Sequence, residues 1–102
     1  MYAPDILIVE DEPSIAEVVE LYLRRAGYQV RVERDGSAAL RALEERLPDL
    51  VVLDIMLPGV DGFSILRWLR GLRDVRDNSE SGDVPVIILT ARRDEVDRIA
   101  GL

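Results

Sequence analysis

The sequence predicts an α/β fold, a three-layer sandwich in which helices cover both faces of a parallel sheet. Three short apolar runs, rich in β-branched residues, are typical of strands that are buried on both faces: Ile6–Val9, Leu50–Leu53 and Val86–Leu89. Segments with apolar residues at helical spacing separate these runs. Because strands that alternate with helices pair in parallel, we expect a doubly wound sheet.

A fourth strand is expected at residues 28–32, where apolar and polar residues alternate, as in an edge strand. The first helix is predicted to start near Pro13 and to stop at Gly27, because glycine is common directly after a helix C-terminus. Five residues mark its apolar face: Ile15, Val18, Val19, Tyr22 and Leu23. Their spacing predicts that this face packs on the sheet.

Two further helices have an aspartate as candidate N-cap. One follows Asp35 and stops at Pro48, with an apolar face made of Ala39, Leu40, Leu43 and Leu47. The other follows Asp61, with Phe63, Leu66 and Leu69 at helical spacing. A fourth helix is expected from about Asp94. Between these last two, Arg73–Asp83 is polar and longer than usual, so we expect a surface loop there, with a partner contact as the alternative.

The composition limits the possible functions. The chain has 102 residues, enough for one domain, and a net charge of −7. It has no Cys and no His, which excludes a Cys nucleophile, a His base and a Cys/His zinc site. All its basic residues are Arg, so a mechanism that needs a lysine is incomplete within these residues. We expect a cytoplasmic segment that contacts neither nucleic acid nor membrane directly, because it is acidic and has no apolar run of membrane-spanning length.

Acidic residues follow the predicted strands. Glu10, Asp11 and Glu12 follow Ile6–Val9, Asp54 follows Leu50–Leu53, and Thr90 follows Val86–Leu89. In a sheet of strand order 2-1-3-4-5 these carboxyl ends converge at one edge. Such a carboxylate cluster needs a proton or a cation, and its hard oxygen ligands suit Mg²⁺. Each residue also has a simpler interpretation, as a helix cap or a loop cap.

At these residues the chain resembles the receiver domain of two-component response regulators. Three segments carry the resemblance: ILIVEDEP at 6–13, LVVLDIMLPGVDGF at 50–63 and PVIILTA at 85–91. The resemblance implies a flavodoxin-like strand order 2-1-3-4-5. It also implies that Asp54 accepts the phosphoryl group and Thr90 is the switch hydroxyl. For Mg²⁺ it implies Glu10, Asp11, Asp54 and the backbone carbonyl of Met56 as ligands.

The resemblance also implies partners and a conformational switch. A sensor histidine kinase would donate the phosphoryl group, and the phosphorylated domain would change conformation to control an output, most simply transcription through a C-terminal DNA-binding domain. A homodimer on phosphorylation is a further implication. The domain would be no enzyme beyond its own phosphorylation and dephosphorylation. Residues 1–102 are interpreted as a receiver domain that is incomplete at the C-terminus, because the family's fifth strand, its Lys-Pro pair and its fifth helix find no counterpart.

Three rival interpretations stay open. A phosphatase of the aspartate-nucleophile type also uses Mg²⁺, but it wants Asp-x-Asp, and Asp54-Ile55-Met56 lacks the second acid. An unphosphorylated receiver-like binding module is the second, although the acidic residues are all present. A flavin-binding relative is the third, and no phosphate-cradling loop follows the first strand.

Overall fold

The computed structural model describes residues 2–57, 60–75 and 84–89. In chain order the elements are β1 (Asp5–Val9), α1 (Pro13–Arg25), β2 (Gln29–Glu33), α2 (Gly36–Glu45), β3 (Leu50–Asp54), α3 (Gly62–Val75) and β4 (Val86–Leu89). The predicted alternation of strands and helices is confirmed over these residues. The surface loop expected from Arg73 begins later than predicted, because residues 73–75 belong to α3. The rest of that loop, Thr90 and the helix expected from Asp94 lie outside the described residues.

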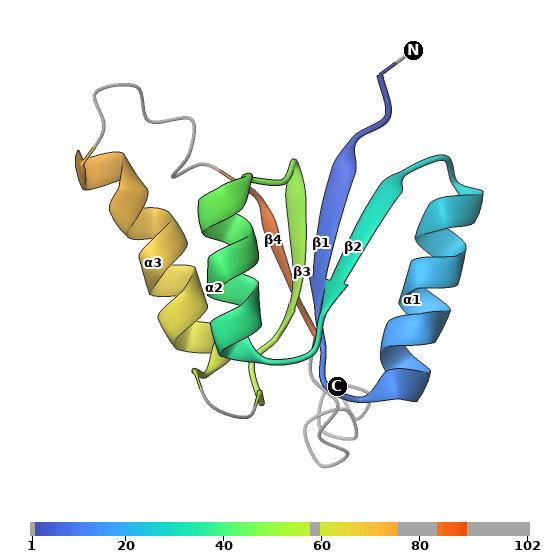
Figure 1. Ribbon diagram of the computed structural model, residues 1–102, viewed down its shortest axis with the longest axis horizontal. Coiled ribbons are helices and arrows are strands. Elements are labelled where there is room, and N and C mark those ends of the chain that lie inside the picture. The colour runs from blue at the N-terminus through green and yellow to red at the C-terminus, as the bar shows by residue number, and fades with distance from the viewer. Residues whose placement is uncertain (1, 58–59, 76–83, 90–102) are drawn as a thin grey trace, which may run out of the picture.

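The four strands form one parallel sheet in the order β2-β1-β3-β4. Helix α1 lies on one face, and α2 and α3 lie side by side on the other, which gives three layers (Figure 1). Since every strand runs the same way, all carboxyl ends meet at one edge, the lower edge in Figure 1.

Alternating strand residues supply two cores. Leu7, Val9, Val51 and Leu53 join α2 and α3 on one face. Ile6, Ile8, Val30 and Val52 join the partly buried Val19 and Leu23 of α1 on the other. The continuous apolar runs of β1 and β3 are thus explained, because every side chain of Ile6–Val9 and of residues 51–53 is buried on one face or the other.

The helix boundaries follow from local chemistry. Pro13 begins α1, where its missing N–H has no helical partner to lose. Gly27, with φ of 98°, ends that helix in the left-handed conformation that favours glycine. The Asp35 carboxylate accepts the Ala38 N–H at 2.8 Å, and the Asp61 carboxylate accepts the Ser64 N–H at 2.9 Å. Both predicted N-caps are confirmed.

Three side chains predicted to face the core do not. Val18, Tyr22 and Phe63 are each more than half exposed. The sheet-facing residues of α1 are instead the buried Ala16 with Val19 and Leu23. The apolar arc on each helix is wider than the strip that the sheet can cover, so periodicity located the arc and not the covered part of it.

Strand β4 is also more exposed than predicted. Its run was expected to be buried on both faces, but Ile87 and Ile88 are about half exposed. Within the described residues β4 is an outer strand, paired only with β3. Its expected burial therefore needs more covering structure than the described residues supply.

The amino end of the sheet is held by ion pairs. Arg31 of β2 reaches both carboxylate oxygens of Asp5 at 2.8 and 3.2 Å, and it also donates to the carbonyl oxygens of Ala42 and Arg46 at the end of α2. Arg46 lies 3.4 Å from the same Asp5 carboxylate. One arginine thus joins β1, β2 and the carboxyl end of α2.

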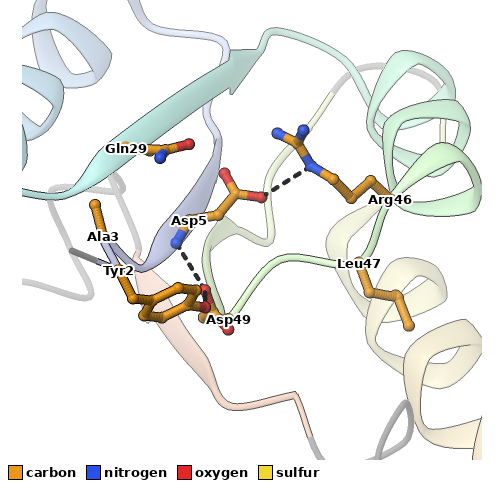
Figure 2. A pocket seen from close by; sticks show the side chains of 7 residues that line it. All are labelled: Tyr2, Ala3, Asp5, Gln29, Arg46, Leu47 and Asp49. Atoms are coloured by element: carbon orange, nitrogen blue, oxygen red, sulfur yellow. Dashed lines mark hydrogen bonds and ion pairs between the residues drawn. The ribbon is translucent and has the colours of Figure 1, made fainter.

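An open pocket of about 360 Å³ lies beside this network (Figure 2). Asp49 in its wall accepts hydrogen bonds from the Tyr2 hydroxyl and the Asp5 N–H. The charged side chains around this pocket thus have partners: Asp5 pairs with Arg46, and Asp49 accepts from neutral donors. The pocket lies at the opposite edge of the sheet from the acidic residues. Among the described helices, none is both long and apolar enough to cross a membrane.

Candidate phosphoacceptor site

Two buried carboxylates stand together at the carboxyl edge of the sheet. Strands β1 and β3 are neighbours, and their last paired residues are Val9 and Leu53. Glu10 follows Val9, and Asp54 follows Leu53. The exposed fractions of these two side chains are 0% and 1%. Parallel pairing therefore places one acidic side chain directly beside the other.

Asp11 completes the group. One carboxylate oxygen from each of Glu10, Asp11 and Asp54 lies within 4.8 Å of the others. Asp11 is exposed, while the other two are buried, so the cluster is open to solvent on one side. The convergence predicted from strand order is confirmed for these three residues.

The cluster is electrostatically unfavourable without a cation. The pKa of the Glu10 carboxyl is raised to about 7, chiefly by burial and also by the nearby Asp54 and Asp11 carboxylates, while the hydrogen bond from the Glu12 N–H lowers it. That N–H donates to Glu10 Oε2 at 3.0 Å. Glu10 Oε1 is buried and has no hydrogen-bond partner among the described residues. A divalent cation would satisfy this orphaned oxygen and neutralise the repulsion, so the donor set fits Mg²⁺.

Glu12 does not cap α1 through its side chain, as the helix-cap interpretation of the acidic run would require. Glu12 occupies the N-cap position of α1 but makes no side-chain capping hydrogen bond. Its carboxylate instead accepts the Ser14 hydroxyl at 3.1 Å. Glu10 accepts from Glu12, two residues on and outside the helix. Glu10 and Asp11 therefore belong to the acidic cluster at the sheet edge, whereas the Glu12 carboxylate bonds to the first turn of α1.

Asp54 also shapes the loop that follows it. Its Oδ1 accepts the Met56 N–H at 2.9 Å, so the loop-capping interpretation holds together with the acidic cluster. The Gly62 N–H then donates to the Ile55 carbonyl oxygen at 3.3 Å, which closes the loop as α3 begins. Met56 lies directly in this loop, and its carbonyl as a ligand stays a prediction. Thr90 lies outside the described residues.

A buried aspartate beside two other carboxylates, at the carboxyl edge of a doubly wound parallel sheet, forms a group that could hold a divalent cation. Comparison with known proteins narrows the class of protein. Residues 6–102 match the response regulator receiver domain, and the chain belongs to that family.

Known relatives agree with the family. The chain is 40% identical over 99 residues to the transcriptional regulatory protein AfsQ1 of Streptomyces coelicolor, across 97% of this chain and 40% of that protein. It is 46% identical over 97 residues to the DNA-binding response regulator MtrA of Mycolicibacterium smegmatis, across 95% of this chain and 39% of that protein. The chain thus spans about two fifths of each relative's length.

A solved structure supports the fold and the site class. The receiver domain of a sensor histidine kinase from Pseudomonas aeruginosa superposes with a TM-score of 0.73 and 37% identity, across 96% of this chain and 75% of that one. That structure has a magnesium ion coordinated in its active-site cleft. The flavodoxin-like order predicted for the first four strands is confirmed.

Two glycines contribute more than the sequence indicated. Gly62 and Gly36 are the first residues of α3 and α2, and at both positions close neighbours leave no room for a side chain. A Cβ at Gly62 would lie 2.5 Å from the Ile55 Cα and 2.8 Å from the Asp54 carbonyl oxygen. The position of Gly62, a few residues after Asp54, could have indicated from the sequence that it packs near this site. Nothing in the sequence indicated that Gly36 would lie against Val60.

Proposed function

We propose that this chain is the phosphoacceptor of a two-component pathway, and that Asp54 accepts a phosphoryl group from a phosphohistidine of a sensor histidine kinase. The observation that carries the proposal is the pair of buried carboxylates, Glu10 and Asp54, with Asp11 beside them. A merely structural role gives no reason to bury two acids with one Glu10 oxygen that has no partner in the described part of the chain.

The reaction is a simple phosphoryl transfer. A carboxylate oxygen of Asp54 forms a bond to phosphorus as the phosphorus–nitrogen bond of phosphohistidine breaks, and the histidine ring keeps the bond's electron pair. The Met56 N–H, 2.9 Å from Asp54 Oδ1, holds the carboxylate in one orientation. Glu10, Asp11, Asp54 and the Met56 carbonyl would hold Mg²⁺, which supplies positive charge to offset the negative charge of the incoming phosphoryl group.

The modification then acts as a switch. Phosphorylation replaces the −1 charge of the Asp54 carboxylate with about −1.5 to −2 on the acyl phosphate, so the sheet edge gains about −0.5 to −1 charge. Thr90 moves toward the new phosphoryl oxygens, and the face near the fourth helix shifts between two arrangements. That face then binds a partner or a second copy. The domain itself turns over no external substrate apart from its own phosphorylation and dephosphorylation.

The whole protein carries the output. Its relatives are transcriptional and DNA-binding regulators about two and a half times the length of this chain. A C-terminal DNA-binding domain therefore accompanies the receiver domain in the intact cytoplasmic protein. This segment makes no direct contact with nucleic acid or membrane, in keeping with its net charge of −7.

The proposal is tested by incubating the intact protein with acetyl phosphate and measuring its mass. We expect a gain of one phosphoryl group that requires Mg²⁺ and is absent in Asp54→Asn. Equal uptake by the folded Asp54→Asn variant would contradict the assignment. Continuous release of phosphate from phosphomonoesters would favour the phosphatase alternative.

A further inference from the structure

Helix α2 begins in direct contact with the loop that follows Asp54. Gly36, the first residue of α2, is buried, and an added Cβ would overlap the carbonyl oxygen of Val60. The same Cβ would lie 2.7 Å from the Val60 carbonyl carbon and from its Cβ. Because two of these three atoms are backbone, rotation of a side chain cannot relieve the overlap.

The need for glycine at position 36 is steric. Gly36 is helical, and among the described glycines only Gly27 has a positive φ. An alanine at 36 could therefore adopt the observed backbone conformation, and in a helix it would normally be preferred to glycine. What excludes it is the space occupied by Val60.

Val60 belongs to the loop between β3 and α3, and hydrogen bonds tie this loop to the end of β3. Residues 55–61 connect Asp54 to α3, and the Met56 and Gly62 N–H groups both bond back to the Asp54–Ile55 segment. At the start of α3, a Cβ added to Gly62 would lie 2.8 Å from the Asp54 carbonyl oxygen, so the helix backbone itself lies close to Asp54. Val60 is two residues before Gly62, whose N–H donates to the Ile55 carbonyl oxygen. A displacement of Val60 by the start of α2 would therefore also move Gly62 and, through it, the segment next to Asp54.

We propose that Gly36 is a positioning residue for the phosphoacceptor loop. By having no side chain, it lets α2 abut Val60 and sets the place of Asp54 and Met56 relative to Glu10 and Asp11. In Figure 1 the first turns of α2 and α3 lie next to each other at the edge of the sheet where the acidic cluster lies. This inference rests on the proposed function, and it names a residue on a different element from any of the acidic ones.

The test compares Gly36→Ala with Gly71→Ala in the intact protein. Gly71 is also helical, and a Cβ there would meet nothing within 4 Å, so it receives the same chemical change in open space. Three quantities are measured well below the melting temperature: Mg²⁺ affinity from amide chemical shifts, the amide shifts of Met56 and Gly62 without metal, and the rate of phosphoryl uptake from acetyl phosphate.

Relative to the parent protein, we expect the folded Gly36→Ala variant to bind Mg²⁺ at least tenfold more weakly and to take up the phosphoryl group at least tenfold more slowly. The amide chemical shifts of Met56 and Gly62 should also differ from those of the parent. Gly71→Ala should match the parent within twofold. A folded Gly36→Ala protein that matches the parent in affinity and uptake overturns the inference. A parent protein that takes up no phosphoryl group instead overturns the proposed function, so the two failures are distinct.

A second pair of variants decides the question if Gly36→Ala does not fold. Val60→Gly removes one overlapping atom and frees the backbone at 60 to retreat. Folding of the Gly36→Ala/Val60→Gly protein, with a Mg²⁺ affinity within twofold of Val60→Gly alone, supports the inference. A double variant that stays unfolded, or that binds Mg²⁺ tenfold more weakly than Val60→Gly, contradicts it.

Discussion

Glu10 and Asp54 stand side by side one residue beyond the last paired rung of β1 and β3, and both side chains are buried. Their carboxylate oxygens approach each other and Asp11 within 4.8 Å. The same register that pairs the strands therefore forces two like charges together. The predictions below follow from that conflict and from the contacts that hold the surrounding fold.

The raised pKa of Glu10 predicts a pH dependence of stability. Its carboxyl titrates near 4.5 in the unfolded chain and about 7 in the folded one, so the folded state holds the proton more tightly. Without metal, this contribution to the free energy of unfolding is complete below pH 4.5 and is lost as pH rises through 7. Relative to the parent, Glu10→Gln should gain about 2–3 kcal/mol over that interval. Urea denaturation in a chelator measures the difference, which would stay constant with pH if Glu10 titrated normally.

Mg²⁺ should stabilise the folded protein through the acidic cluster. At ten times its dissociation constant, a ligand that binds only the folded state adds about 1.4 kcal/mol to the free energy of unfolding. Thermal unfolding with and without a chelator measures this gain. Asp11→Asn should abolish most of it, because Asp11 is one of the three converging carboxylates. Glu17→Gln removes the same charge from an exposed position on α1 and should keep the gain. Equal behaviour of the two variants would contradict a site at the cluster.

Arg31 should matter more for stability than Arg46, although both contact Asp5. The Arg31 side chain is 24% exposed and also bonds two carbonyl oxygens of the α2 C-terminus, whereas the Arg46 side chain is 63% exposed. We expect Arg31→Met to lower the free energy of unfolding by about 2–4 kcal/mol, because it leaves the partly buried Asp5 carboxylate and the carbonyl groups without their main partner. Arg46→Met should lower it by less than about 1 kcal/mol. Chemical denaturation at neutral pH compares them, and similar losses would refute the assigned hierarchy.

Much of the fold and of the acidic cluster was predictable from sequence, for a physical reason. A strand buried on both faces, such as Ile6–Val9, has a composition that few other elements share. Once the strands are parallel, the residue after each strand falls at one edge, which placed Glu10 beside Asp54 without any knowledge of side-chain conformation.

The errors concern what covers each surface. The apolar spacing of α1 is the same for Val19, which packs on the sheet, and for Val18, which is half exposed. Periodicity gives a direction on the helix and not the extent of the neighbour that covers it. The importance of Gly36 was also hidden, because its neighbour Val60 is brought to it only by the packing of α2 beside the loop after β3.

The most direct test of the central claim is to locate the phosphoryl group on the chain. The intact protein is treated with acetyl phosphate and Mg²⁺, reduced with borohydride, which converts an acyl phosphate to an alcohol, and mapped by peptide mass spectrometry. The account predicts homoserine at position 54 and at no other aspartate, and none when Mg²⁺ is withheld. Homoserine at Asp11 or another acid, with Asp54 unchanged, would contradict it.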